Sequence, residues 1–384
     1  MPPEPIIIDK PVNWDDLAKS IEDGEAVLIL GPDAIPLYRT SSTDNVKAVD
    51  ERSIMTFSEL TRHKILTDDD IKTFYYKRDN LFLFNDGDDG KRRAQKVVRE
   101  CARDKTWLPD EELIKQIIAI PFSLVLNINP DEHLFNTYKE YEVKTLFDFF
   151  TTKNKTTPNF DLLNPENPLL YNLCGNATER LDSLILDYND LFEFFQVVLT
   201  DAQTPLALRT KLQEADRFIF LGLHLEKWYF QFLIHYLNKL EKSSTNNATR
   251  CFSILCDVSE DTREFVFRQF KLECITPSRA AFEELYLACK KRKILRDLPN
   301  PHSSGTTRVL RCIEQNKFFE AFKLLEKYAH QIDPNAIILL KGRYNAWLKN
   351  QEAGIVDSRD LTTEINQIRH TLITFATQIK DEDE

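Results

Sequence analysis

Apolar and polar positions follow two different patterns along the chain, and the first pattern extends to about residue 290. Short apolar runs, typical of strands buried on both faces, occupy residues 26–30, 121–131, 143–147, 168–174, 217–223, 252–258 and 272–276. Stretches with helical spacing lie at residues 14–22, 111–120, 187–199, 209–215, 225–240 and 260–270. Because helices that alternate with short strands form βαβ units, we predict an α/β fold. Its Rossmann-like, mostly parallel sheet would leave a ligand crevice at the carboxyl ends of the strands.

The second pattern begins after residues 296–307, RDLPNPHSSGTT, whose prolines, glycine and hydroxyl residues are typical of a linker. Beyond the linker, apolar residues at helical spacing predict a small all-α bundle over residues 308–384. The helical stretches lie at residues 309–332, 336–356 and 360–379. We interpret residues 1–295 as the Rossmann-like domain, in which the charged and aromatic residues 38–110 form a helical insertion.

The composition narrows the classes of partner and site. The chain has 384 residues and a formal net charge of −11, so it lacks the overall basic character of most nucleic-acid-binding proteins. Its seven cysteines are odd in number and include no Cys-x-x-Cys pair, which predicts neither a disulfide framework nor a metal site. No secretory leader or membrane span is predicted either. We therefore expect a cytoplasmic protein that binds neither nucleic acid nor membrane.

Polar turns follow the predicted strands and would meet at one edge of the sheet. They carry Gly31, Asn129, Cys174 with Gly175, Gly222 and Asp257. In the first turn, GPDAIP, a glycine after a strand is a weak signal for a phosphate-binding turn, and Asp33 adds a negative charge there. A plain tight turn is the alternative interpretation.

The second turn, NINPD, carries amides and a carboxylate in alternate positions. Asn127, Asn129 and Asp131 would lie on one side if the strand extends that far, where they could hold ribose hydroxyls and a ring amide. The alternative is an Asx-type turn closed by Asn129 and Asp131 around Pro130.

Four segments in order, VLILG, PFSLVLNINPD, PLLYNLCGN and RFIFLGLHLEKWYFQFL, resemble the sirtuin-like (silent-information-regulator-two-like) domains of bacterial conflict and antiphage systems. The similarity covers about residues 14–290. In active relatives it implies NAD⁺ binding and cleavage of the nicotinamide–ribose bond, with an asparagine and a histidine as the catalytic pair.

Carried onto this chain, the resemblance places its functional positions as follows. The catalytic positions are Asn129, Asp131 and Cys174, which stands where the family has histidine. Positions near the cofactor are Gly31, Asp33 in place of a glycine, Gly222, and His224 in place of a phosphate-contacting serine. The polar turns at the strand ends add Asn127, Gly175 and Asp257 as candidate cofactor-binding residues. A thiol with a reference pKa near ~8.5 is a poorer general base than imidazole.

Three hypotheses follow from this replacement. The first is a catalytically degenerate defence component that binds NAD or a related nucleotide, or only scaffolds. The second is an active NAD⁺ hydrolase that depletes the cofactor on infection. The third is an enzyme that uses Cys174 on another nucleotide.

The C-terminal stretch GRYNAWLKNQEAGIVDSRDLTTEINQIRHTLITF is similar to the effector-associated domains (type eleven) of bacterial conflict systems, over about residues 307–380. The matching positions are Arg343, Tyr344, Asn345, Gly354, Glu364, Asn366, Ile368 and Arg369. The resemblance implies a death-domain-like adaptor that recruits a protein partner by homotypic pairing, and with it a homo-oligomer. The alternative is that these apolar residues serve only as the core of the bundle.

Overall fold

The computed structural model describes residues 12–43, 46–152, 163–200, 205–239, 251–255, 259–270, 273–275, 277–299, 305–314, 316–353 and 358–379. The chain divides into two compact units, residues 1–298 and 299–384. Arg296, at the start of the predicted linker, belongs to the first unit, where its guanidinium donates to the carbonyls of Ile118, Ile120 and Phe122.

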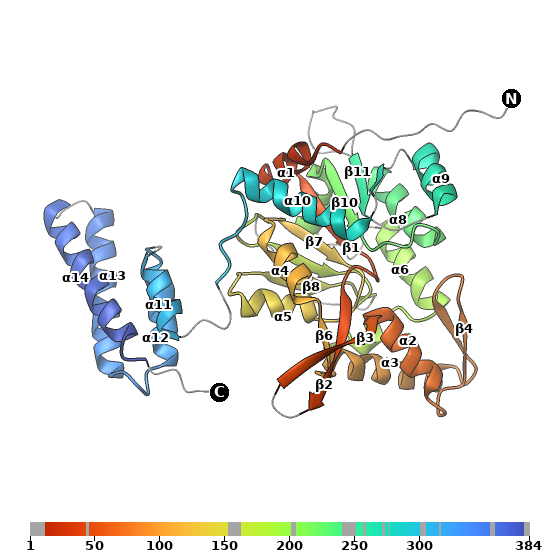
Figure 1. Ribbon diagram of the computed structural model, residues 1–384, viewed down its shortest axis with the longest axis horizontal. Helices are drawn as coiled ribbons and strands as arrows, with labels where there is room; N and C mark the ends of the chain where they lie inside the picture. Colours follow the sequence, from red (N-terminus) through yellow and green to blue (C-terminus); the bar gives the residue numbers. More distant parts are fainter. Residues whose placement is uncertain are drawn as a thin grey trace. The chain divides into compact units, whose positions relative to one another are not determined.

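The first unit is built on a sheet of seven strands (Figure 1). They are β1 (Ala26–Leu30), β7 (Leu124–Asn127), β8 (Leu146–Phe149), β9 (Leu169–Asn172), β10 (Arg217–Leu221), β11 (Cys251–Leu255) and β12 (Glu273–Ile275). Their order across the sheet is β12-β11-β10-β1-β7-β9-β8, and every neighbouring pair is parallel. The predicted parallel α/β sheet is confirmed, with β1 at its centre.

Alternate residues of each strand enter two different cores, because successive side chains point to opposite faces of a sheet. Val27 and Ile29 pack against one helical layer, whereas Leu28 and Leu30 pack against the other. The first layer contains α6 (Tyr188–Thr200), α7 (Leu206–Glu214) and α8 (Trp228–Lys239). The second contains α1 (Trp14–Glu22), α4 (Glu111–Ala119), α5 (His133–Glu140) and α10 (Ser278–Arg292). Because a helical layer covers each face of the sheet, every residue of β1 is apolar.

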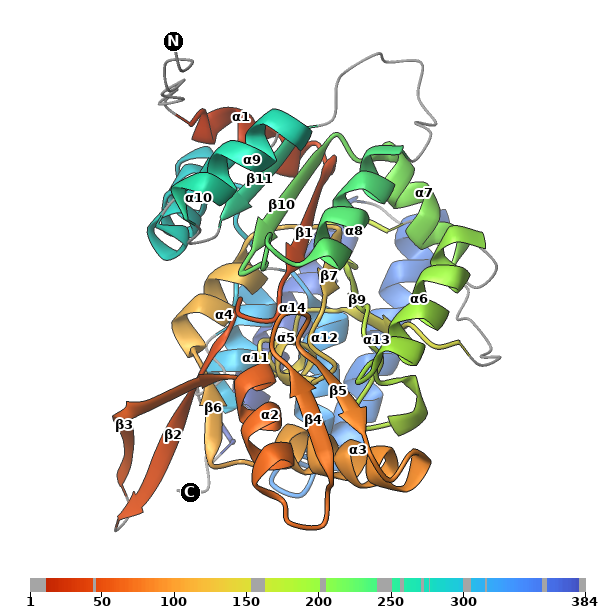
Figure 2. The same cartoon turned by 90° about the vertical axis from the view of Figure 1, so that its right-hand side faces the viewer.

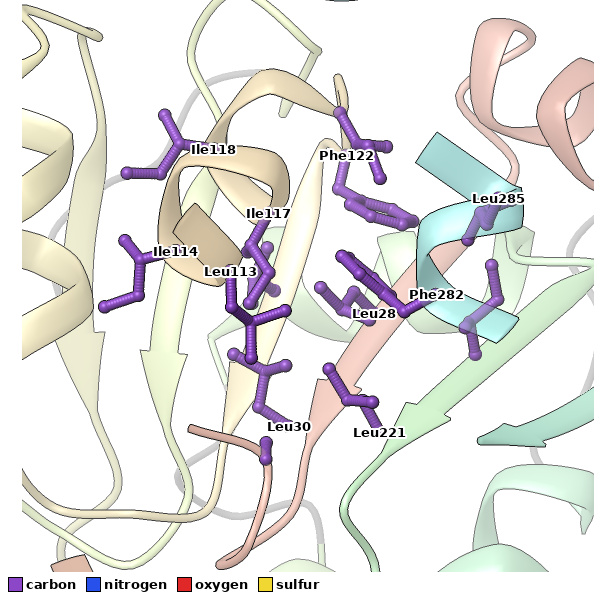
Figure 3. Packing of buried hydrophobic residues seen from close by; sticks show 14 of the residues in the cluster. Leu28, Leu30, Leu113, Ile114, Ile117, Ile118, Phe122, Leu221, Phe282 and Leu285 are labelled. Atoms are coloured by element: carbon purple, nitrogen blue, oxygen red, sulfur yellow. The ribbon is translucent and has the colours of Figure 1, made fainter. Parts of the chain in front are cut away.

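Figure 3 shows the second core from close by. Leu28 and Leu30 of β1 lie between α4 residues, including Leu113 and Ile117, and Phe282 of α10. These side chains are almost completely excluded from solvent, so the sheet is a rigid platform for the loops at its carboxyl edge. Helix α9 (Glu260–Phe270) contributes Val266 to the opposite core.

The insertion was predicted to be helical; its described residues contain two helices and also five strands that the sequence pattern did not separate. The helices are α2 (Phe57–Thr67) and α3 (Asp88–Arg103), and the strands are β2 (Pro36–Thr43), β3 (Val46–Thr56), β4 (Thr73–Tyr76), β5 (Leu81–Phe84) and β6 (Trp107–Pro109). The strands form two small antiparallel sheets, β3-β2-β6 and β4-β5. Figure 2 shows β4 and β5 beside α2 and α3, beyond the end of the large sheet.

The second unit is a bundle of four helices: α11 (Gly305–Glu314), α12 (Phe318–Lys327), α13 (Pro334–Ala353) and α14 (Ser358–Ala376). The single pattern predicted over residues 309–332 is two helices. Asn316 adopts a left-handed backbone with φ of 58°, and Lys317 N–H donates to Cys312 O, which ends α11. Ile368 and Leu372 of α14 lie in the bundle core. None of the helices in the described ranges of either unit is long and apolar enough to cross a membrane.

Candidate functional site

The parallel register brings the ends of four strands to one edge of the sheet. Leu30 of β1 pairs with Leu221 of β10 on one side and with Asn127 of β7 on the other, and Asn127 pairs with Asn172 of β9. The turns that carry the predicted site residues therefore start side by side. Asp257, the last of them, lies outside the described residues.

At the ends of β7 and β9, two buried asparagines join the strands. Asn127 Nδ2 donates to Asn172 Oδ1 at 3.1 Å and to the Asn129 carbonyl at 2.8 Å. Asn172 is fully buried, and its Nδ2 donates to the Asp131 carbonyl at 2.9 Å. Asn127 was predicted to face a cofactor, but here its amide holds the protein's own backbone.

Asn129 and Asp131 lie in the loop after β7 and not on a strand, because β7 ends at Asn127. Asn129 Nδ2 donates to the Pro32 carbonyl at 3.2 Å, which ties this loop to the turn after β1. Asp131 Oδ1 accepts the backbone N–H of His133 at 2.9 Å, near the start of α5. Both side chains are buried, and the contact of Asp131 agrees with the Asx-type alternative.

A cavity of about 170 Å³ lies beyond these strand ends. The loops after β7 and β9 contribute Ile128, Asn129 and Cys174 to its wall. Aromatic and aliphatic side chains from α2, the β4–β5 hairpin, α6 and α8 complete it, among them Phe57, Phe82, Phe194, Phe195 and Phe230. Asn129 and Cys174 thus share one largely apolar cavity.

Cys174 is partly buried in this wall, and its environment works against proton chemistry. Burial raises the pKa of the Cys174 thiol to about 12. The next residue, Gly175, has a φ of +89°, and a side chain there would collide with the Ser183 carbonyl at 2.3 Å. Gly175 therefore fixes the turn that presents Cys174, and any side chain at its place would displace that turn.

The turn after β1 is closed by the turn after β10. Gly31 N–H donates to the Leu221 carbonyl at 2.7 Å, and Asp33 N–H donates to the Gly222 carbonyl at 3.3 Å. A Cβ added to Gly31 would lie 2.0 Å from Gly222 O, so the two backbones are in direct contact. Ala34 N–H donates back to Gly31 O at 3.1 Å. With Pro32 lacking an N–H, no donor of residues 31–34 remains free for an anion.

Charged side chains cover the same contact. His224 Nε2 lies 2.8 Å from Asp33 Oδ2, and His224 Nδ1 lies 3.3 Å from Glu226 Oε1. The hydrogen bond to Asp33 and the two nearby carboxylates raise the pKa of His224 above its usual value of 6.5, against burial and Lys227, which lower it. Each ring nitrogen of His224 thus lies near a carboxylate of the protein, and these carboxylates would repel a phosphate.

Two side chains at and just before the start of α8 form hydrogen bonds with the turn between β4 and β5. Lys227 is 8% exposed, and its Nζ donates to the carbonyls of Lys77 at 3.1 Å and Arg78 at 2.6 Å. The Tyr229 hydroxyl donates to the Asp79 carbonyl at 3.0 Å. The ammonium group of Lys227 is thus bonded to the backbone at the turn of the hairpin.

Comparison with protein families adds two matches. Residues 123–275 match the SIR2-like domain family, and residues 306–380 match effector-associated domain 11. The chain carries a SIR2-like domain followed by an effector-associated domain 11. Both resemblances inferred from the motifs are thereby confirmed. A comparison with curated proteins finds no match.

The dinucleotide that a SIR2-like domain implies has two ring systems joined by a pyrophosphate, and the site fits only part of it. A cavity of ~150 Å³ suffices for benzene, so one of about 170 Å³ suits a single ring. The pyrophosphate would need free backbone N–H groups at the turn after β1, where they are bonded to the protein itself. The residues present fit one ring of NAD and do not fit its pyrophosphate.

The described residues contain no cluster of three or more histidine, cysteine or carboxylate side chains that could hold a metal ion. The sequence did not reveal three residues of the site: Arg62, which lines the cavity, and Asn172 and Lys227, which donate to backbone carbonyls beside it. Asn172 ends its strand just as Asn127 does, and this parallel position is a signal that could have found it. Lys227 and Arg62 gave no such signal, because their neighbours are distant in the chain.

Proposed function

We propose that this chain is a non-hydrolysing sirtuin-like component of a bacterial conflict or antiphage system. In this proposal its SIR2-like domain holds a small ligand or acts as a scaffold, and its effector-associated domain recruits a protein partner. The order of the two domains supports a role in defence. The proposal is carried by the cavity that combines Asn129 with a thiol in place of imidazole.

The chemistry of that cavity supports loss of catalysis. With a pKa of about 12, Cys174 is protonated at neutral pH and cannot accept a proton as a histidine would. Loss of a general base typically reduces a rate by about 10²–10⁴-fold. The amide of Asn129, the other member of the family's catalytic pair, is bonded to the Pro32 carbonyl. The closed turn after β1 further removes the donors that would position a dinucleotide.

Recruitment of a partner is supported by apolar side chains outside the core of the helical bundle. Phe319 of α12 is 63% exposed, and Ile338 and Leu339 of α13 are 65% and 71% exposed. Exposed apolar side chains that gather on a surface commonly mark sites of protein association. We propose that the effector-associated domain pairs with a domain of its own kind.

The test of lost catalysis is incubation of the purified full chain with NAD⁺, with nicotinamide release followed by chromatography. We expect no release above a buffer blank. The variant Cys174→His restores the imidazole, and we expect it to remain inactive because the turn after β1 still lacks free donors. Nicotinamide release by the unmodified chain that Asn129→Ala abolishes would establish an active hydrolase and overturn the proposal.

A further inference from the structure

The cavity beside Asn129 and Cys174 contains one feature that the loss of catalysis leaves unexplained. Among the described residues that line it, Arg62 of α2 is the single charged side chain. The remaining wall is mostly aromatic and aliphatic, with the polar side chains of Ser58, Thr61 and the two asparagines Asn80 and Asn129. A cation at an apolar wall requires a partner, because removal of a charge from water without compensation is unfavourable.

Arg62 has no carboxylate partner in the part of the chain that the structure describes. Arg62 makes a cation–π contact with Tyr75, whose ring centroid lies 5.5 Å from the guanidinium carbon. Arg292 of the same unit contrasts with it, because Arg292 pairs with both Asp15 and Glu22. The guanidinium of Arg62 is partly buried and contacts an aromatic face. Because no carboxylate of the described residues pairs with it, it is available to an anionic ligand.

The neighbours of Arg62 form a continuous polar edge along this side of the cavity. The Tyr75 hydroxyl donates to Asn80 Oδ1 at 2.9 Å, and Asn80 keeps its left-handed backbone, with φ of 56°, at the tip of the hairpin. Since the Asn80 oxygen is occupied, its amide nitrogen remains a donor. Arg62 and Asn80 therefore place donors on the insertion side, opposite the apolar side chains of α6 and α8.

We propose that this cavity binds a planar aromatic ring that carries one anionic group, with the anion on Arg62 and the ring against the aromatic wall. The volume of about 170 Å³ suits one ring. The bidentate guanidinium suits a carboxylate or a phosphate monoester. A pyrophosphate at the turn after β1 is not part of this site, because the backbone donors there are already used. The inference rests on the proposed function, since it names the ligand class of the same cavity.

Nicotinate and nicotinamide make a matched pair of probes, because they share the ring and differ in the charge of one substituent. Phenyl phosphate tests the phosphate form of the same chemistry. Binding to the full chain is measured by titration calorimetry. We expect nicotinate or phenyl phosphate to bind about 10-fold or more tightly than nicotinamide, as a charge-assisted hydrogen bond implies.

The variant Arg62→Met removes the charge and keeps a side chain of similar length. We expect it to lose the preference for the anion, whereas Arg62→Lys keeps the charge and retains part of it. Arg92→Met is the matched control, because Arg92 lies on α3 of the same insertion and is 71% exposed. Thermal unfolding of each variant verifies that the fold is intact.

Two results would overturn the inference: neither anionic probe binds more tightly than nicotinamide, or Arg62→Met leaves the anion preference unchanged. Either failure is distinguishable from failure of the proposed function, which is decided by nicotinamide release from NAD⁺. A chain that binds no anionic ring and releases no nicotinamide would retain the proposed function and lose this ligand class.

Discussion

The two halves of the sheet edge use their polar groups in different ways. At the ends of β7 and β9, Asn127 and Asn172 bond to each other and to the loop backbone, and an apolar cavity remains beside them. At the ends of β1 and β10, the turns of Gly31 and Gly222 bond directly to one another. The first half borders a cavity lined mostly by apolar side chains, whereas in the second half the backbones of the two turns are in direct contact.

The comparison shows that the strand ends of one sheet can border a cavity in one half and close on one another in the other half. The parallel sheet still presents its strand ends at one edge, as ligand-binding α/β folds do. In the turn after β1, the backbone N–H groups of Gly31, Asp33 and Ala34 all donate to carbonyls of the protein itself. Two substitutions and one measurement of pH dependence test this contrast between the halves.

The largest effect is expected from substitution of a glycine at the closed turns. Gly222 has a φ of +67°, and a Cβ there would lie 2.3 Å from Ala34 N. We expect Gly222→Ala to lower the free energy of unfolding by more than about 3 kcal/mol, measured by chemical denaturation. In Gly90→Ala the added Cβ would meet no atom nearer than 3.6 Å, so this control should change stability by less than about 1 kcal/mol. Equal effects of both variants would mean that the two turns are not in tight contact.

An intermediate effect is expected at the asparagine pair. Asn172→Ala removes one of the two acceptors of the buried Asn127 amide and the donor to the Asp131 carbonyl. We expect a loss of about 2–3 kcal/mol in the free energy of unfolding, because unsatisfied buried polar groups are costly. The exposed Asn136 of α5 provides the control, and Asn136→Ala should fall within about 0.5 kcal/mol of the unmodified chain. A neutral Asn172→Ala would contradict the role assigned to this pair.

The smallest effect concerns the pH dependence of the closed turn. Because Asp33 and Glu226 raise the pKa of His224 above 6.5, its contribution to stability is fully present below the unfolded pKa, near 6.5. The contribution is lost as pH rises through the higher pKa of the folded state. We therefore expect the stability difference between the unmodified chain and His224→Asn to shrink as pH increases above 6.5, in denaturation curves at several pH values. A difference that grows with pH would show that His224 is neutral in the fold.

The sequence alone determined the layers of this protein and the location of its candidate site. Runs such as AVLIL are apolar at every position, because both faces of the strand must be covered, and this property is local to the run. Parallel strands then place Gly31, Asn129, Cys174 and Gly222 at one edge. The order of these residues also carried the resemblance to the SIR2-like family.

The tertiary structure alone decided which polar groups of that edge are free. Asn127 meets Asn172 across 45 positions, Asn129 meets Pro32 across 97, and Lys227 meets Lys77 across 150. Hydrogen bonds depend on distances and angles within a few tenths of an ångström, which spacing along the chain does not encode. For the same reason the sequence did not reveal Arg62. Its role depends on the cavity that it lines and on the lack of a paired carboxylate among the described residues.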